Sequence, residues 1–127
     1  MTRTILIVED DLELQELYSM MLEGLDFELE RALDGEEALE KLARRLPDLV
    51  ILDILLDKVM GNEVFGLMRQ EPRYAGVPVI IVSVLSADRC EDLIEMDSRT
   101  LFLRKPFRRE DLMAAVRKAL PDEQREA

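Results

Sequence analysis

The chain has 127 residues, of which 48% are hydrophobic and 35% are charged, as expected for one globular domain. With 28 acidic and 17 basic residues its net charge is −11, so we expect no direct binding of this domain to nucleic acid or to a membrane surface. The sequence contains no histidine, which excludes a Ser-His-Asp triad, a His-ligated zinc and a phosphohistidine carried by this chain.

Short apolar runs alternate with amphipathic stretches from the N-terminus onward. Residues 5–8 are a continuous aliphatic run, typical of a strand buried on both faces. Asp11 then caps a helix whose apolar residues recur at helical spacing over residues 14–25. A short strand over residues 27–31 follows. Asp34 caps a second helix, with Glu37 at its third position, an apolar stripe that includes Leu46, and an end at Pro47.

The second half of the chain repeats this pattern. Residues 49–52 and 78–82 predict two more strands buried on both faces, and residues 101–103 predict a short last strand. A helix follows the loop around Gly61, a polar segment over residues 87–96 predicts a weak helix, and a final helix ends at Pro121. Cys90, the single cysteine, excludes an internal disulfide; it lies in the polar segment without a partner, and we assign it no role.

Five strands alternating with five helices predict an α/β fold, a doubly wound (βα)5 unit with a parallel sheet. We expect one domain over residues 1–120, and a polar tail or the start of a linker over residues 121–127. No segment resembles a targeting signal or a membrane span, so we expect a cytoplasmic protein. In such folds, sites form at the carboxyl ends of the strands.

Four predicted strands deliver a polar side chain directly after an apolar run: Glu9 and Asp10, Asp53, Ser83 and Lys105. Three carboxylates in one cleft repel one another unless a cation lies between them, and oxygen ligands alone select a hard ion such as Mg²⁺. An ammonium group and a hydroxyl beside them are what an aspartyl-phosphate site requires. Each residue alone is more often a cap, a turn or a surface group; the joint placement favours a site. The five glycines form neither a Rossmann nor a P-loop motif.

These residues resemble the receiver domain of two-component response regulators. The matching segments are ILIVEDD (5–11), PDLVILDILL (47–56), Gly61, VPVIIVS (77–83) and RKPF (104–107). The resemblance covers about residues 3–120. It implies a flavodoxin-like receiver fold with five parallel strands in the order 2-1-3-4-5.

The resemblance also assigns roles to single residues. It implies that Asp53 is the phosphoacceptor, that Lys105 is the lysine found at this place in the family, and that the Lys105–Pro106 bond is cis. The ammonium group of Lys105 can pair either with a carboxylate or with a phosphoryl oxygen. The remaining roles it implies are a magnesium site made by Glu9, Asp10, Asp53 and the Leu55 carbonyl, and a switch pair made by Ser83 and Phe102. The phosphoryl donor is then a partner histidine kinase or histidine phosphotransfer protein, and the effector that receives the output is unknown. Such a chain catalyses only its own phosphorylation and dephosphorylation.

The sequence departs from the family at several positions. Asp57 stands where many receivers have proline, and Val84 replaces the small residue after the switch hydroxyl. Other departures are Met60, and Ser98, Arg99 and Thr100 before the last strand. Leu55 and Leu85 occupy positions that tune hydrolysis in the family, and neither side chain can position a water, so we expect a long-lived phosphoryl group.

Two alternative functions remain open at this point. A pseudo-receiver would use the same fold only as a protein-interaction module, and Asp57, Val84 and the altered segment before the last strand favour it. A phosphatase with an aspartate nucleophile would need a second acid and a cap domain, for which the chain has no room.

Overall fold

The computed structural model describes residues 3–56 and 59–120. Strands and helices alternate along the chain as predicted: β1 (Arg3–Val8), α1 (Leu12–Met21), β2 (Phe27–Ala32), α2 (Gly35–Arg44), β3 (Leu49–Asp53), α3 (Gly61–Gln70), β4 (Val79–Ser83), α4 (Ala87–Glu91), β5 (Thr100–Arg104) and α5 (Arg109–Ala119). The strands form one parallel sheet in the order β2-β1-β3-β4-β5, which confirms the predicted fold. Within the described ranges, no helix has the length and apolarity to cross a membrane. The predicted tail over residues 121–127 lies outside them.

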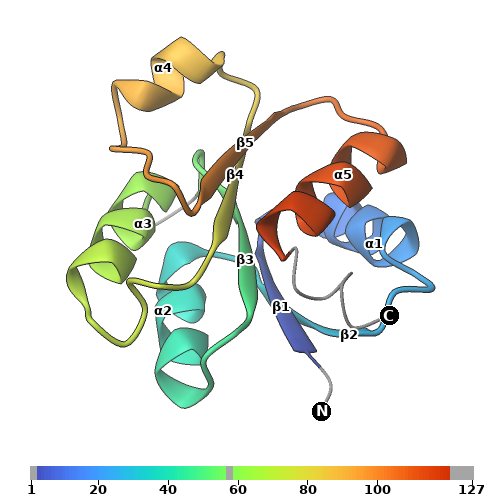
Figure 1. The fold of residues 1–127 in the computed structure, drawn as a ribbon, viewed down its shortest axis with the longest axis horizontal. Coiled ribbons are helices and arrows are strands. Elements are labelled where there is room, and N and C mark those ends of the chain that lie inside the picture. The colour runs from blue at the N-terminus through green and yellow to red at the C-terminus, as the bar shows by residue number, and fades with distance from the viewer. Residues whose placement is uncertain (1–2, 57–58, 121–127) are drawn as a thin grey trace.

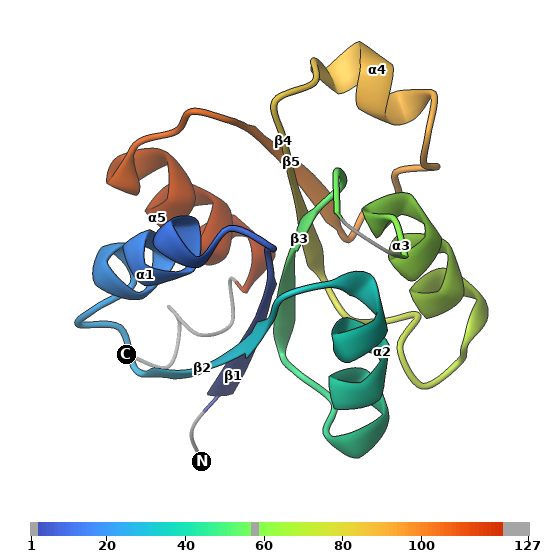
Figure 2. The same ribbon diagram turned by 180° about the vertical axis from the view of Figure 1, so that it is seen from behind.

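Helices cover both faces of the sheet and create two separate cores (Figures 1 and 2). Helices α1 and α5 pack on one face, where Tyr18 and Val116 meet strand residues such as Ile7. The other face carries α2, α3 and α4, and alternate strand residues such as Val50 point toward it. Because both faces are covered, β3 and β4 are buried at every position, as their continuous apolar runs predict.

Both predicted aspartate caps are confirmed. Asp11 accepts hydrogen bonds from two N–H groups in the first turn of α1, and Asp34 accepts one from the Glu37 N–H. The predicted end of α2 was wrong: the helix ends at Arg44, and Leu46 is 48% exposed instead of lying in its apolar stripe. A residue before proline is driven to extended backbone, so the helix ends before Leu46 and not at Pro47 itself.

The segment after β4 also differs from its prediction. Only five residues of the expected helix over 87–96 are helical, Ala87–Glu91. Ser86 precedes them as the N-cap, and its side chain accepts a hydrogen bond from the Arg89 N–H. Cys90, interpreted as part of a polar segment, is a residue of α4, and its side chain is fully buried in the core. Burial raises the pKa of its thiol, more than a hydrogen bond with Ser83 lowers it. Cysteine is a small apolar residue that often lies in cores, so a polar neighbourhood in the sequence was a poor guide here.

Candidate functional site

The polar side chains predicted at the strand ends lie at one edge of the sheet. Asp53 and Ser83 are the last residues of β3 and β4, Lys105 follows β5, and Glu9 follows β1. These four strands are consecutive neighbours in the sheet, so their carboxyl ends meet. Strand β2 ends in Ala32 and adds no comparable group.

Lys105 joins two buried carboxylates. Its Nζ lies 2.8 Å from Glu9 Oε1 and 2.9 Å from Asp53 Oδ2. The side chain of Glu9 is 2% exposed and that of Asp53 is 6% exposed. A carboxylate held away from water at such burial requires a paired charge, and Lys105 supplies it to both groups. The sequence leaves open whether Lys105 pairs with a carboxylate or with a phosphoryl oxygen, and the structure shows it paired with two carboxylates. One of them is Glu9, to which the resemblance gave only a role in the metal site.

A third carboxylate completes an acidic cluster. Glu9, Asp10 and Asp53 each offer an oxygen, and these oxygens all lie within 4.8 Å of one another. One ammonium group offsets only part of this charge. Ligands that are all oxygen, converging on one point, fit a hard divalent cation such as Mg²⁺. The residues present therefore fit the cation that the sequence predicts, while the Leu55 carbonyl as a further ligand stays a prediction.

The electrostatics of the cluster are clearest at Glu9. Burial raises the pKa of its carboxyl group to about 7, more than the hydrogen bond from Lys105 lowers it, and the charge of Asp53 adds to the rise. Desolvation and a like charge both disfavour the ionised form, so the metal-free site holds a proton on Glu9 under mildly acidic conditions.

A pH dependence of stability follows from this shift. Folded Glu9 binds its proton below about pH 7, whereas unfolded Glu9 releases it above about 4.5. In that window the folded state holds more protons, so the free energy of unfolding contributed by Glu9 rises as the pH falls and is lost as the pH rises through 7. The free energy of unfolding can be measured by urea titration in the presence of a metal chelator. As the pH rises across this window, wild type should lose stability relative to Glu9→Gln. A constant difference between the two proteins would contradict the shift.

Backbone N–H groups orient two of the side chains. Asp53 Oδ1 accepts a hydrogen bond from the Leu55 N–H, and Ser83 Oγ accepts one from the Leu85 N–H, each at 3.1 Å. The loops after β3 and β4 are thereby tied to the site. Leu55 and Val84 are 43% and 55% exposed beside it. Asp57 lies outside the described residues.

Gly61 brings helix α3 against the backbone of the site. A Cβ atom added there would lie 2.1 Å from the Asp53 carbonyl oxygen and 2.6 Å from the Ile54 Cα. The Gly61 N–H donates to the Ile54 carbonyl at 2.9 Å. Only glycine fits such an approach of two backbones, so this residue fixes the position of the β3 end.

The switch and proline predictions concern the β5 end. The Lys105–Pro106 bond is cis, as predicted. Phe102 is partly buried and packs against the core on the α2–α4 face of the sheet, two strands from Asp53. Its role as a switch aromatic stays a prediction.

Sequence reasoning missed Gln15. This side chain of α1 is fully buried, and its Nε2 donates to the carbonyl oxygens of Ile7, Glu9 and Ala32 at 3.0–3.2 Å. It ties the ends of β1 and β2 together directly behind Glu9. The available signal was that Gln15 lies among the apolar residues of its helix. A polar side chain at such a position is compatible either with a buried hydrogen-bond network or with an exposed site, so the sequence alone did not distinguish the two.

Comparison with known protein families identifies the family of this chain. Residues 5–117 match the family described as the response regulator receiver domain. The chain belongs to this family. Receiver domains therefore supply the reference for its fold, and the predicted resemblance is confirmed.

Relatives of this receiver include whole transcriptional regulators. It is 35% identical over 118 residues to the DNA-binding dual master transcriptional regulator RpaA of Synechocystis, and 36% identical over 118 residues to the phosphate regulon transcriptional regulatory protein PhoB of Rhizobium meliloti. These matches cover 91% of the chain in each case, but 48% of RpaA and 51% of PhoB. The chain thus spans about half the length of these curated relatives.

Solved structures share the fold over almost the whole receiver. The chemotaxis protein CheY4 of Vibrio cholerae superposes with a TM-score of 0.85 at 25% identity, covering 94% of this chain and 100% of that one. The receiver domain of the sensor histidine kinase PA1611 of Pseudomonas aeruginosa, with magnesium coordinated in its active-site cleft, gives 0.83 at 25% identity, covering 95% and 99%.

Proposed function

We propose that this receiver accepts a phosphoryl group on Asp53, with Mg²⁺, from the phosphohistidine of a partner histidine kinase or histidine phosphotransfer protein. The observation that carries the proposal is the contact of Lys105 with Asp53 beside the acidic cluster. The absence of histidine from the chain agrees with a donor on another protein. The reducing cytoplasm, expected from its single cysteine, is the compartment we propose.

The chemistry assigned to each residue follows from its position. A carboxylate oxygen of Asp53 attacks phosphorus, an O–P bond forms, and the P–N bond of the donor breaks, leaving its electron pair on the imidazole. Mg²⁺ held by Glu9, Asp10 and Asp53 would supply positive charge to the phosphoryl oxygens. Lys105 already contacts Asp53 and needs little movement to meet a phosphoryl oxygen there. Ser83 presents a hydroxyl donor from the neighbouring strand.

The output we propose is a change of conformation on one face of the domain. Ser83 would turn toward the phosphoryl group, Phe102 would fill the space that it leaves, and the surface of α4, β5 and α5 would change. The proposal includes no direct contact of this domain with nucleic acid, because its net charge of −11 opposes one.

The test is direct. Incubating the protein with Mg²⁺ and phosphoramidate, then measuring its intact mass, should show one added phosphoryl group in wild type and none in Asp53→Ala. Beryllium fluoride with Mg²⁺ should protect wild type, and not the variant, against thermal unfolding.

The second candidate is a pseudo-receiver, a protein-interaction module that works without phosphorylation. The observation that favours it is α4, which has only five residues and belongs to the expected output face. An unphosphorylated wild type that also ignores beryllium fluoride would establish this alternative instead.

The lifetime of the phosphoryl group is a separate prediction. Leu55 and Leu85 flank the site and carry no polar atom in their side chains to align a water, so the added mass in wild type should persist for many minutes. Leu55→Asn introduces a hydrogen-bonding group at an exposed position and should shorten the half-life severalfold. Loss of the adduct is followed by intact mass over time, and a wild-type label lost within seconds would contradict the prediction.

A further inference from the structure

Gln15 is a buried polar residue to which the proposed chemistry gives no part. It lies in α1, and its side chain is fully buried. Its Nε2 donates to the carbonyl oxygens of Ile7 at 3.0 Å, Glu9 at 3.1 Å and Ala32 at 3.2 Å. One amide group therefore joins the carboxyl ends of β1 and β2 to helix α1, beside the backbone that carries the acidic cluster.

The orientation of this amide is determined by its three acceptors. If its nitrogen and oxygen were exchanged, an oxygen without a hydrogen would lie within 3.2 Å of three carbonyl oxygens. In the orientation observed, Oε1 is buried and accepts no hydrogen bond from a described residue. A buried acceptor without a donor is unfavourable, so the bonds that the nitrogen donates have to outweigh that cost. The amide is therefore held at this position as a donor.

The Glu9 carbonyl connects the amide to the residues of the acidic cluster. That carbonyl belongs to the peptide group between Glu9 and Asp10, and both residues contribute an oxygen to the cluster. The Glu9 N–H is held as well, because it donates to the Ala32 carbonyl at 3.0 Å. The backbone that carries the two carboxylates is thus fixed on both sides of residue 9.

A fixed backbone matters here because the three carboxylates repel one another. Their oxygens lie within 4.8 Å of one another, and Lys105 pairs only with Glu9 and Asp53. Asp10 forms no ion pair with a described residue, so its place in the cluster depends on the backbone that carries it. Mg²⁺ demands near-ideal octahedral geometry, so displaced ligands bind it less tightly.

From these contacts we propose that Gln15 is a positioning residue for the magnesium site. Its amide holds the peptide group between Glu9 and Asp10, and thereby keeps both carboxylates where they meet Mg²⁺. The amide contacts no carboxylate of the cluster, so it should set the affinity for Mg²⁺ and not the rate of phosphoryl transfer once the ion is bound. Because Mg²⁺ binding is part of the proposed function, this role rests on it, but it requires no transfer of a phosphoryl group.

The test is the dissociation constant of Mg²⁺ in Gln15→Met, which keeps about the length of the side chain and removes both N–H donors. Mg²⁺ is titrated into ¹⁵N-labelled protein, and the amide shifts of Asp10, Asp53 and Leu55 give the constant. We expect it to rise by about 10–100-fold, as is usual when a group that orients a metal ligand is removed. Gln15→Asn withdraws the amide by one methylene and should also bind Mg²⁺ more weakly, which tests the same role if Gln15→Met does not fold.

The rate of phosphorylation separates positioning from a direct part in the chemistry. With phosphoramidate as the donor, Gln15→Met should need about 10–100-fold more Mg²⁺ to reach half of its maximal rate, while the maximal rate should equal that of wild type. A loss of folding alone would instead lower the maximal rate and leave the dissociation constant of the folded protein unchanged.

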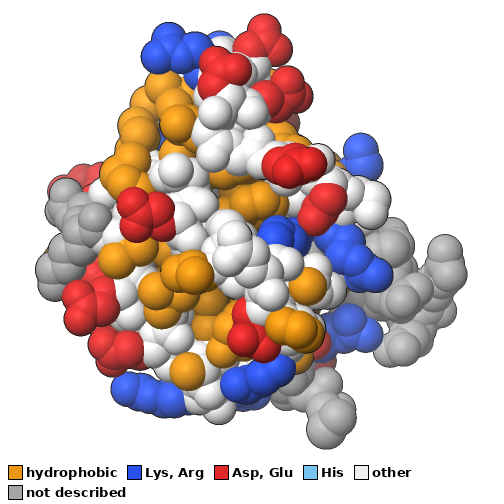
Figure 3. Space-filling view, turned by 90° about the vertical axis from the view of Figure 1, so that its left-hand side faces the viewer, with side chains coloured by type: hydrophobic (Ala, Val, Ile, Leu, Met, Phe, Trp, Pro, Cys, Tyr) orange, Lys and Arg blue, Asp and Glu red, His pale blue; other side chains and the backbone are white. Residues whose placement is uncertain are grey.

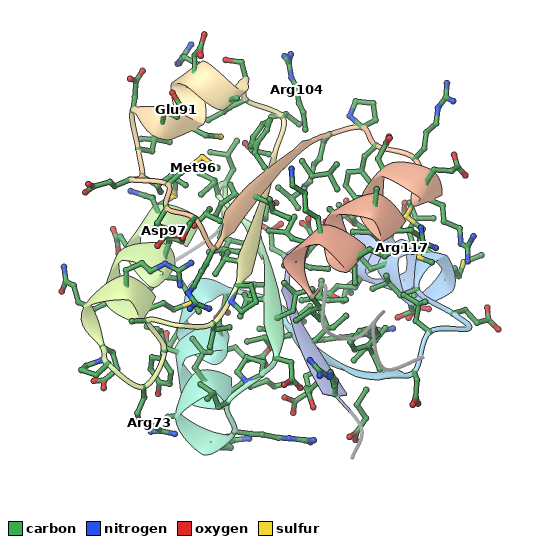
Figure 4. The ribbon with its side chains drawn as sticks, viewed as in Figure 1. Arg73, Glu91, Met96, Asp97, Arg104 and Arg117 are labelled. Carbon is green, nitrogen blue, oxygen red and sulfur yellow. The ribbon has the colours of Figure 1, made fainter. Side chains whose placement is uncertain are left out.

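Two variants control for lost stability. Leu22→Ala removes buried apolar atoms from the end of α1, and Asp97→Asn weakens the ion pair in which Arg69 Nε lies 2.8 Å from Asp97 Oδ2. Asp97 precedes the amino end of β5 and lies beside α3, on the other side of the sheet from α1 (Figure 4). Both variants should unfold at a lower urea concentration than wild type and bind Mg²⁺ with unchanged affinity.

Residue-resolved shifts are needed because the chain carries acidic groups elsewhere. Figure 3 shows Asp and Glu side chains gathered at the end of the molecule that carries α4, where Asp88 and Glu91 are exposed. Within the described residues, only Glu9, Asp10 and Asp53 bring three such ligands together. Shifts confined to α4 in wild type would therefore contradict the magnesium site.

The possible failures can be told apart. An unchanged dissociation constant in folded Gln15→Met would overturn the positioning role and leave the proposed function intact. An equal loss of affinity in Leu22→Ala would also overturn it, because any loss of stability in α1 would then act on the site. A wild type without Mg²⁺-dependent shifts at Asp10 and Asp53 would contradict the proposed function itself, and the positioning role with it.

Discussion

Replacing Gly61 by alanine should destabilise this receiver by about 3 kcal/mol, the upper end of the range of about 1–3 kcal/mol that is typical when a buried position is overpacked. The added methyl group would lie 2.1 Å from the Asp53 carbonyl oxygen. The atoms it meets are backbone at the end of a central strand, which cannot rotate away as a side chain could. The midpoint of urea unfolding, at constant slope, measures the change.

The matched control lies in the same helix. Gly66→Ala makes the same chemical change where a Cβ atom has no neighbour within 4 Å. Because alanine is the better helix former, this variant should gain about 0.5–1 kcal/mol. The folded fraction of Gly61→Ala should also be phosphorylated slowly, since a displacement of about 1 Å at a reacting group costs about a hundredfold in rate. An unfolding free energy for Gly61→Ala equal to that of wild type would show that the approach of α3 to β3 is looser than the structure has it.

Lys105→Met should produce the second large effect, on both phosphorylation and stability. The variant keeps the aliphatic length of the side chain and removes the ammonium group that contacts Glu9 Oε1 and Asp53 Oδ2. Two buried carboxylates would then face each other beside Asp10 without a cation, and losing one partner of a buried ion pair costs about 3–5 kcal/mol at most. The rate of phosphorylation by phosphoramidate should fall by about 10²–10³-fold, the cost of removing one charge-stabilising donor.

The pH dependence of this variant separates charge from packing. Protonation of the carboxylates relieves their repulsion, so the loss of stability should be larger at pH 8 than at pH 5. Lys118→Met, at an exposed lysine of α5, is the control and should change stability by less than about 0.5 kcal/mol. A Lys105→Met protein that is phosphorylated at the wild-type rate would remove this residue from the proposed mechanism.

The strand ends were predictable because two signals agreed there. An apolar run such as Leu49–Leu52 has to lie inside a parallel sheet, and the polar residue that ends it, Asp53, has to emerge at the carboxyl edge. The order of the strands then brings Asp53, Ser83 and Lys105 together without any knowledge of their contacts.

What the sequence did not reveal depends on packing between distant segments. The amide of Gln15 reaches three carbonyl groups from two strands, and no local pattern encodes that. Helix α4 ends early, at Glu91, and Cys90 is its buried residue. Both features depend on how the residues after Ser86 pack against the sheet.

The central claim is that Asp53 carries the phosphoryl group, and the position of the modification tests it most directly. Protein treated with Mg²⁺ and phosphoramidate is reduced with borohydride, which converts an acyl phosphate to the corresponding alcohol, and is then digested and sequenced by tandem mass spectrometry. We expect homoserine in place of aspartate at position 53 and nowhere else. Unmodified Asp53, or a homoserine at Asp10 instead, would contradict the account.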